Sequence, residues 1–211
     1  KVSVEVSSAA GRGEGSLLYA AEAKVEGGEF KATLQPAKAG TLVRIAARCT
    51  EGCPYGKTTI ATLVDVVFGD VWYCAGQNNM GVHLEYTFAR NATKAAVEEG
   101  KYDNVRLYSM ASNLNYAQPW ISPQGALDMD TFFQYSATCW YFAESLTDEL
   151  SKGVGKKAPP IGLIHVSVAQ SKIEEWVDDD TLLRCKDVSA RSSYSPRGHY
   201  PTRVRPFGDM T

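Results

Sequence analysis

The sequence lacks the features that would suit it to nucleic acid, a membrane or a metal. Its 22 basic and 24 acidic side chains give a formal charge of −2, so it offers no strongly basic surface for phosphates. Its longest apolar stretches, such as residues 160–168, are far shorter than the ~20 residues of a membrane span. It has no second Cys pair and no His cluster to complete a metal site. We therefore expect no nucleic-acid partner, no membrane span, no metal and no cofactor.

What remains is the composition of a folded chain. Of its 211 residues, 44% are hydrophobic and 22% are charged, and the length suits one large domain or two small ones. The chain begins Lys1-Val2-Ser3-Val4-Glu5-Val6, in strand-like alternation and without an initiator Met. We therefore expect a soluble protein whose numbering starts inside a longer precursor.

Two local features bear on the compartment. Cys49 and Cys53 flank a short turn, where a disulfide is favoured over a metal site. Asn91-Ala92-Thr93 satisfies the acceptor rule for N-glycosylation at Asn91. Together they favour a secreted, lysosomal or cell-surface protein, and a cytosolic protein with five buried thiols is the alternative. The pairing of the other cysteines stays open; they are Cys74, Cys139 and Cys185.

Residues 1–68 predict a β-sandwich segment. Short alternating runs are separated by glycine turns, a pattern that favours antiparallel strands. The clearest hairpin lies at residues 25–34, with Glu26-Gly27-Gly28-Glu29 at its turn. The strands are expected at residues 17–25, 30–34, 42–47 and 58–67.

Residues 69–211 predict an α/β domain with a parallel sheet. Buried strands are expected at residues 71–75, 105–110 and 161–168. Between the last two, apolar side chains recur at helical spacing and indicate a helix. These side chains are Cys139, Phe142, Ala143, Leu146 and Leu150. The segment from Arg191 onward is arginine-rich and is expected to be a surface or docking loop.

The candidate binding residues follow two of these strands. In an open α/β sheet, ligands bind at the carboxyl ends of the strands. The first segment is Gly76-Gln77-Asn78-Asn79-Met80, and the second begins Ala169-Gln170-Ser171. The first is dense in neutral hydrogen-bonding groups, which suit sugar hydroxyl and acetyl groups, and it contains no nucleophile. The predicted binding set is Gly76, Gln77, Asn78, Asn79, Gln170 and Ser171.

An ordered set of motifs resembles the sialate O-acetylesterase family. Residues 65–80, DVVFGDVWYCAGQNNM, are similar to the family's Gly-Asp-Val-Trp strand and the Gly-Gln-Ser-Asn-Met that follows it. The resemblance covers nearly the whole chain. The later blocks are VRLY at 105–108, ATCWYF at 137–142, PIGLI at 160–164, IEEW at 173–176 and LRC at 183–185.

The resemblance implies an extracellular or lysosomal carbohydrate esterase of the SGNH-hydrolase type. Its fold would be a flavodoxin-like α/β domain preceded by β-sandwich material, and its ligand a carbohydrate or glycoconjugate. In that family the serine of Gly-Gln-Ser-Asn attacks the acetyl carbonyl, and a later Asp and His activate it. Glycine and amide groups form the oxyanion hole.

This chain departs from the family pattern where the chemistry is done. Asn78 stands at the serine position, and an amide nitrogen cannot form the acyl-enzyme because its lone pair is delocalised. Ala169-Gln170-Ser171 stands where the family has Gly-Gly-Thr, so the glycines that bring a backbone N–H to the oxyanion are gone. The family's Asp-x-x-His block has no counterpart before Thr211.

Two hypotheses follow. In the first, the protein is catalytically inactive and serves as a glycan-binding or structural component of an extracellular or surface assembly, with other extracellular proteins as further partners. In the second, it is an active carbohydrate O-acetylesterase, completed by a downstream segment and using a nucleophile such as Ser171. A minor third reading treats Asn78 as an engineered replacement of serine.

The remaining candidates have structural interpretations. His165 lies inside an apolar strand and is expected to be a hydrogen-bonded core residue, whereas His83 and His199 lie in polar segments. Asp178-Asp179-Asp180 lacks the spacing of a calcium loop and is expected to be a turn or helix cap. Trp72 and Trp176 are large enough to stack on a sugar, but are expected to be core or wall residues.

Overall fold

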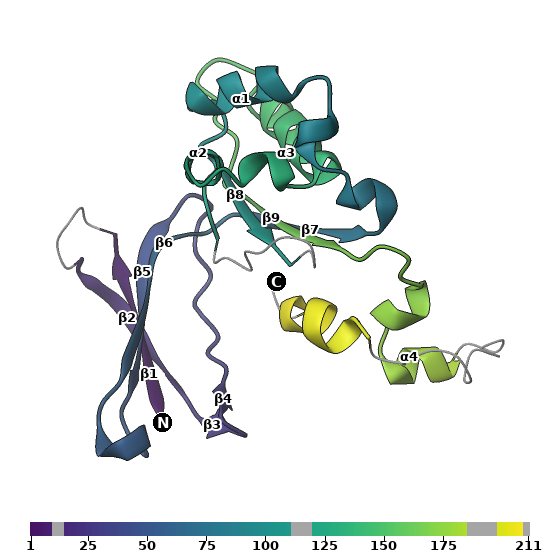
Figure 1. Ribbon diagram of the computed structural model, residues 1–211. Coiled ribbons are helices and arrows are strands. Elements are labelled where there is room, and N and C mark those ends of the chain that lie inside the picture. Colours follow the sequence, from purple (N-terminus) through teal and green to yellow (C-terminus); the bar gives the residue numbers. More distant parts are fainter. Residues whose placement is uncertain (10–14, 111–119, 185–197, 209–211) are drawn as a thin grey trace. The chain divides into compact units, whose positions relative to one another are not determined.

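The computed structural model describes residues 1–9, 15–110, 120–184 and 198–208 (Figure 1). The chain divides into two compact units, Lys1–Asp70 and Val71–Thr211. Cys185 and Arg191 lie outside the described residues. The two units are treated separately below.

The first unit is built on a four-stranded antiparallel sheet with the order β2-β1-β5-β6. Its strands are β1 (Val2–Ser8), β2 (Leu17–Ala23), β5 (Leu42–Cys49) and β6 (Ile60–Val67). Alternation positions the buried side: Val2, Val4 and Val6 on β1 are at most 8% exposed. A separate ribbon pairs β3 (Val25–Glu26) with β4 (Glu29–Phe30). Its Gly27-Gly28 turn has φ of 60° and 87°, which glycine adopts without strain.

The expected sandwich is not confirmed by this unit. Its described residues form one four-stranded sheet and the short ribbon, so a second sheet large enough to pack on the first is lacking among them. The strand expected at residues 30–34 is wrong beyond Phe30, because β4 ends there and residues 31–34 have no strand partner. Alternation alone cannot hold a strand without a neighbour to bond.

The second unit has a three-stranded sheet with the order β7-β9-β8. The strands are β7 (Asp70–Gly76), β8 (Val105–Ser109) and β9 (Ile161–Ser167), which confirms the three predicted strands within one residue at most of their ends. β8 and β9 are parallel, from Val105 opposite Ile161 to Ser109 opposite His165.

The strand order differs from the flavodoxin-like arrangement, in which the first strand lies between the second and third. Here β9 takes the middle position. Burial gives the physical reason: six of the seven β9 residues are buried, whereas β7 exposes Val71, Trp72 and Tyr73 by 37–46%. The most buried strand therefore occupies the site with two bonded neighbours, and the prediction that residues 71–75 are buried is wrong for most of them.

Helices gather on one side of this sheet (Figure 1). They are α1 (Arg90–Glu98), α2 (Pro123–Asp128) and α3 (Ala137–Leu150); α4 (Asp179–Arg184) follows later in the chain. The predicted helix is α3. Ser136 caps its start, because the Ser136 Oγ accepts a hydrogen bond from the Cys139 N–H at 3.2 Å.

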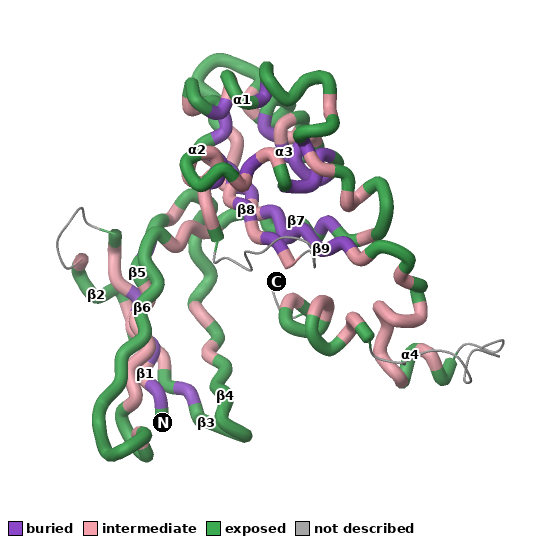
Figure 2. The backbone as a smooth tube through the Cα atoms, in the orientation of Figure 1, coloured by how far each residue is buried: buried purple, intermediate pink, exposed green. Residues whose placement is uncertain are grey.

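The core of the second unit lies between α3 and the sheet. Buried positions concentrate along β8, β9 and α3 (Figure 2). Trp140 is fully buried and packs edge-on against Phe132 and Tyr102, with centroids 4.8 and 5.6 Å away. Among the described residues, every helix is too short or too polar to cross a lipid bilayer. Helical turns also occupy Tyr200–Val204 and Arg205–Phe207, within the segment predicted to be a loop.

Candidate functional site

Two turns that follow β7 and β9 lie together, as expected for strand ends in an α/β sheet. The Val168 N–H donates to the Gly76 carbonyl at 3.2 Å and joins them. Gly76 suits this junction because a Cβ there would lie 3.2 Å from the Met80 Cβ. The structure therefore brings the residues after Gly76 next to those after Val168.

Asn78 opens a short 3-10 turn, Asn78–Gly81, with a φ of 28°. Asn is one of the few residues besides glycine that adopt this region of backbone conformation with any frequency. The Met80 N–H donates to the Gln77 carbonyl at 2.8 Å and closes the turn. Asn78 thus fits a tight turn that leaves its own amide at the surface.

The amide side chains of this site are available to a ligand. Gln77, Asn78 and Asn79 are exposed, and so is Gln170 on the second turn. Within the described part of the chain, none of the four side chains makes a hydrogen bond. Each amide carries both a donor group and an acceptor oxygen, so the site presents paired hydrogen-bonding groups without formal charge.

Gln170 holds a conformation that glycine would adopt more easily. Its φ is 59°, in the left-handed region. Ala169 beside it is exposed. The second turn therefore keeps a left-handed residue in the segment where the family resemblance has two glycines, at a cost of about 1 kcal/mol for a residue with a Cβ.

Ser171 is held by its neighbours. Its Oγ–H donates to the Val168 carbonyl at 2.8 Å, and its Oγ accepts from the Trp176 indole N–H at 3.0 Å. Trp176 in turn packs against His199, with ring centroids 5.1 Å apart. The hydroxyl therefore fastens the second turn, and Trp176 is half-buried between Ser171 and His199. Nothing in the sequence marked this indole as the partner of Ser171.

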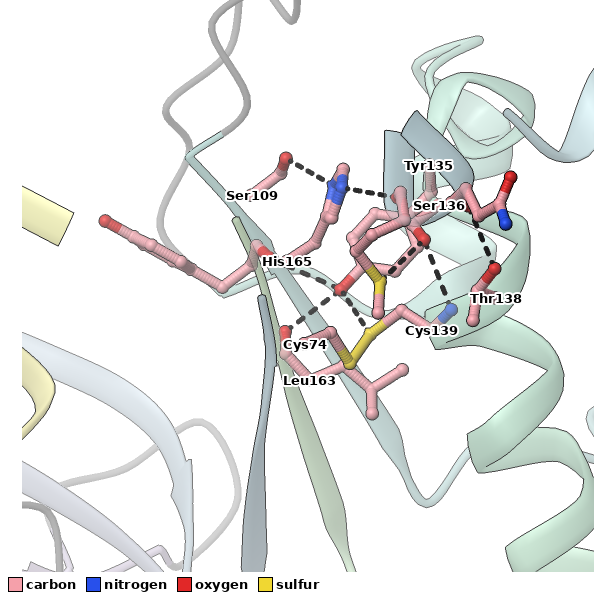
Figure 3. Close-up of a disulfide and its surroundings, with 11 residues drawn as sticks. Cys74, Ser109, Tyr135, Ser136, Thr138, Cys139, Leu163 and His165 are labelled. Carbon is pink, nitrogen blue, oxygen red and sulfur yellow. Dashed lines mark hydrogen bonds between the residues drawn. A yellow bond between two sulfur atoms is a disulfide. The ribbon is translucent and has the colours of Figure 1, made fainter. Parts of the chain in front are cut away.

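Beneath the first turn lies a buried imidazole (Figure 3). His165 is 1% exposed, with Nε2 3.1 Å from the Met80 carbonyl and Nδ1 3.2 Å from Ser109 Oγ. The carbonyl can only accept, so Nε2 carries the proton and Nδ1 accepts from the hydroxyl. Burial lowers the pKa of His165 to about 4, which keeps the ring neutral. The predicted core role of His165 is confirmed.

The start of α3 holds the same turn from another side. Thr138 Oγ1–H donates to the Asn79 carbonyl at 3.0 Å, and Ser136 Oγ–H points to the Met80 sulfur at 3.4 Å (Figure 3). A disulfide joins Cys74, two residues before Gly76, to Cys139 on α3. Sequence reasoning missed this disulfide, because nothing links two cysteines 65 residues apart before the fold is known.

The comparisons with known proteins agree on one family. No family model matches the chain. The mouse (Mus musculus) sialate O-acetylesterase is 32% identical over 162 residues, which are 72% of this chain and 28% of that protein. The rat (Rattus norvegicus) protein of the same name is 33% identical over 166 residues, with the same two shares. The human (Homo sapiens) one is 33% identical over 135 residues, 57% of this chain and 23% of that protein.

This chain belongs to the sialate O-acetylesterase-like family. It spans 28% of the length of the rodent relatives that it matches. A solved structure of a carbohydrate acetylesterase from Xanthomonas citri supports the fold: its TM-score is 0.55 at 21% identity, over 86% of this chain and 37% of that one.

Other predicted residues of this sialate O-acetylesterase-like chain fall outside the two turns. Cys49 and Cys53 form the expected disulfide. Asn91 is exposed in the first turn of α1, whereas Thr93 is buried and its hydroxyl donates to Glu144 at 3.1 Å.

The acidic run caps a helix. Asp178 accepts from the backbone N–H and the hydroxyl of Thr181, both at 2.8 Å, at the start of α4. These bonds hold the pKa of its carboxyl below the usual value. No cluster of three or more metal-ligating side chains occurs in the part of the chain that the structure describes.

Proposed function

We propose that this chain is a catalytically inactive sialate O-acetylesterase-like protein that binds O-acetylated sialoglycans at the two turns. The observation that carries the proposal is Asn78 in the position of the family's serine, exposed on a tight turn. A carboxamide has no nucleophilic lone pair, so it cannot form an acyl-enzyme with an acetyl group. It can still donate to a carbonyl and accept from a hydroxyl.

The surrounding groups support binding. Four exposed amides, which make no side-chain hydrogen bond to any described residue, gather on two turns joined by a backbone hydrogen bond. Hydroxyl, acetyl and N-acyl groups of a sialoside are neutral donors and acceptors that match such amides. A turn fixed in advance loses little conformational freedom when the ligand binds.

An extracellular, lysosomal or surface location belongs to this proposal. Two disulfides join four of the five cysteines, and disulfides persist in oxidising compartments. Asn91 is exposed and is the proposed glycosylation site. Participation in an extracellular assembly with other proteins follows from the proposed loss of turnover, since binding would remain as the useful property.

The second candidate function is carbohydrate O-acetyl ester hydrolysis. It is favoured by the names of the relatives, and by the fact that the chain matches only 28% of their length. The activating Asp and His would then come from a segment outside the 211 residues, and Ser171 would be the nucleophile. Both hydrogen bonds of the Ser171 hydroxyl would have to break before it could attack.

Acetate release separates the two functions. The protein is incubated with 5-N-acetyl-9-O-acetylneuraminic acid and, separately, with p-nitrophenyl acetate. We expect no release above the blank, because Asn78 cannot be acylated. Acetate release that a serine-directed inhibitor abolishes would show that the protein is an active esterase and contradict the proposal. Loss of that release in Ser171→Ala would then support the second candidate, and unchanged release would rule Ser171 out.

Binding is tested with the same sialoside by titration calorimetry. In the double variant Gln77→Ala/Asn79→Ala we expect Kd to rise about tenfold, since two hydrogen bonds of somewhat under 1 kcal/mol each are lost. The control is Gln134→Ala, which removes an exposed amide from the short turn Phe132–Gln134. Equal Kd values for the double variant and the control would exclude the first turn as the binding site.

A further inference from the structure

The turn that carries Asn78 and Asn79 is a short 3-10 turn, Asn78–Gly81. At its two ends the Met80 N–H donates to the Gln77 carbonyl at 2.8 Å, and the Val82 N–H donates to the Asn79 carbonyl at 3.4 Å. Side-chain contacts with its carbonyls restrict the shape of so short a turn further. The carbonyl of Met80 has such a partner in the His165 imidazole.

We propose that His165 is the positioning residue of this site: a buried neutral imidazole that bridges Ser109, at the end of β8, and the Met80 carbonyl, and thereby fixes the turn that presents the amides. The inference rests on the proposed binding function. His165 cannot touch a ligand itself, because it is 1% exposed and both its ring nitrogens are engaged.

The geometry favours a single state of this bridge. Ser109 is 2% exposed, and its hydroxyl meets Nδ1. The Met80 carbonyl meets Nε2, so only the tautomer with a proton on Nε2 satisfies both contacts. Tyr135 packs edge-on against the ring, with centroids 5.4 Å apart, and its own hydroxyl donates to the Leu163 carbonyl at 3.1 Å (Figure 3). Contacts with Ser109 and Tyr135 thus fix the orientation of the His165 ring, and the ring in turn fixes the Met80 carbonyl.

The bridge also connects elements distant in the sequence. Ser109 ends β8, His165 lies in β9, and Met80 follows β7, so one side chain links the carboxyl ends of all three strands. Thr138 holds the adjacent Asn79 carbonyl from α3. Among the described residues, removing the imidazole would leave the Thr138 hydroxyl as the side chain bonded to the carbonyls of the turn.

Three variants test the role. His165→Leu fills the space but cannot donate. His165→Gln keeps an amide donor for Met80 and an oxygen acceptor for Ser109. Val166→Ala is the matched control. Val166 is the fully buried neighbour of His165 on β9, and its side chain lies on the opposite face of the sheet. Its truncation therefore lowers stability without removing a contact of the bridge. All are compared at pH 7 under conditions where each variant is fully folded.

The first readout is hydrogen exchange of the Met80 and Val82 amides. We expect exchange at least tenfold faster in His165→Leu than in Val166→Ala, with His165→Gln restoring most of the protection. The second is the Kd for 5-N-acetyl-9-O-acetylneuraminic acid, expected to rise about tenfold in His165→Leu and to stay unchanged in Val166→Ala. Equal exchange in His165→Leu and Val166→Ala overturns the inference whatever the sialoside result.

The two proposals fail in different ways. If the wild-type protein binds no sialoside while its turn loosens in His165→Leu, the proposed function is wrong and the positioning role stands. If the wild-type protein binds and His165→Leu binds equally well, the positioning role is wrong and the proposed function stands.

Discussion

At the scale of single residues, the site combines strain with burial. Gln170 and Asn78 are among five non-glycine residues with positive φ among the described ones, and they lie on the two joined turns. Asn tolerates this conformation and Gln does so less well. Directly below, His165 holds a polar ring in the core with every polar atom satisfied. The exposed residues therefore carry the strain, and the buried one holds the shape.

Replacing the strained residue with glycine is expected to stabilise the protein. Gln170→Gly removes the Cβ penalty at a φ of 59° and should raise the free energy of unfolding by up to about 1 kcal/mol. Urea denaturation measures the change. The control Gln35→Gly lies in a segment without positive φ and should lower stability instead. A loss in both variants would show that Gln170 is not strained.

The buried imidazole predicts a loss of stability in acid. The pKa of His165 is about 4 in the folded chain, lowered from the ordinary histidine value of 6.5 by burial first and also by the nearby His83. The unfolded chain therefore takes up a proton first as pH falls below 6.5, and the folded chain does so only near pH 4. The free energy of unfolding therefore falls progressively as the pH drops through that window, by about 3 kcal/mol in total.

Unfolding free energies at pH 7 and pH 4.5 measure this contribution. His165→Gln, which does not titrate, should show a smaller decline than the wild type. The same decline in both proteins would assign the acid sensitivity to other groups. Because both forms share all remaining carboxylates and histidines, the difference between them isolates the imidazole.

At the scale of elements, a disulfide cross-links strand β7 to helix α3. The Cys74–Cys139 disulfide closes a separation of 65 residues, against 4 for Cys49–Cys53. Loop-closure entropy predicts about 4 kcal/mol for the long loop and about 2 kcal/mol for the short one. The double variant Cys74→Ala/Cys139→Ala should therefore lose more stability in urea than Cys49→Ala/Cys53→Ala. The reverse order would mean that β7 and α3 are held together mainly by packing.

The sequence predicted the positions of helices and strands better than their burial, their order in the sheet and the disulfide that joins them. Apolar runs located all three strands of the second unit, and helical spacing located α3. The spacing did not identify the buried face fully: Trp140 is fully buried, whereas Phe142 and Leu150 are about 40% exposed. Which strand lies in the middle, and which cysteines meet, depend on contacts between distant segments that no local pattern encodes.

The candidate site was predictable in part. The rule that ligands bind at strand ends selected the two turns, and the structure brings them together. The Ser109–His165–Met80 bridge was not foreseen, since it requires the register of β8 against β9. Local sequence therefore identified the groups at the surface, and the tertiary fold supplies what supports them.

At the scale of the whole molecule, the first unit presents an apolar edge. β6 is an outer strand, and Ile60, Leu63 and Val64 on it are 52–71% exposed. Outer strands with apolar side chains pair readily with other chains, and a net charge of only −2 offers little repulsion. The isolated 211-residue chain is therefore expected to associate with itself.

Charging this edge should reduce self-association. In Leu63→Lys we expect the chain to remain monomeric at roughly tenfold higher concentration, because a buried lysine would be costly in any strand-to-strand contact. Size-exclusion chromatography with light scattering measures the molar mass at each protein concentration. Thr62→Lys adds the same charge on the other side of β6, at an exposed polar position. Equal effects of both variants would attribute the change to net charge alone.

The two disulfides also set an order of oxidation during folding. Cys49 and Cys53 are close in any conformation of the chain, so they can pair early. Cys74 and Cys139 meet only after β7 and α3 have packed. A reduced chain placed abruptly in strong oxidant would therefore risk trapping Cys74 with a wrong thiol before its helix arrives. Slow oxidation in a thiol–disulfide buffer, which lets wrong pairs exchange, is the regime in which this protein should reach its native bridges.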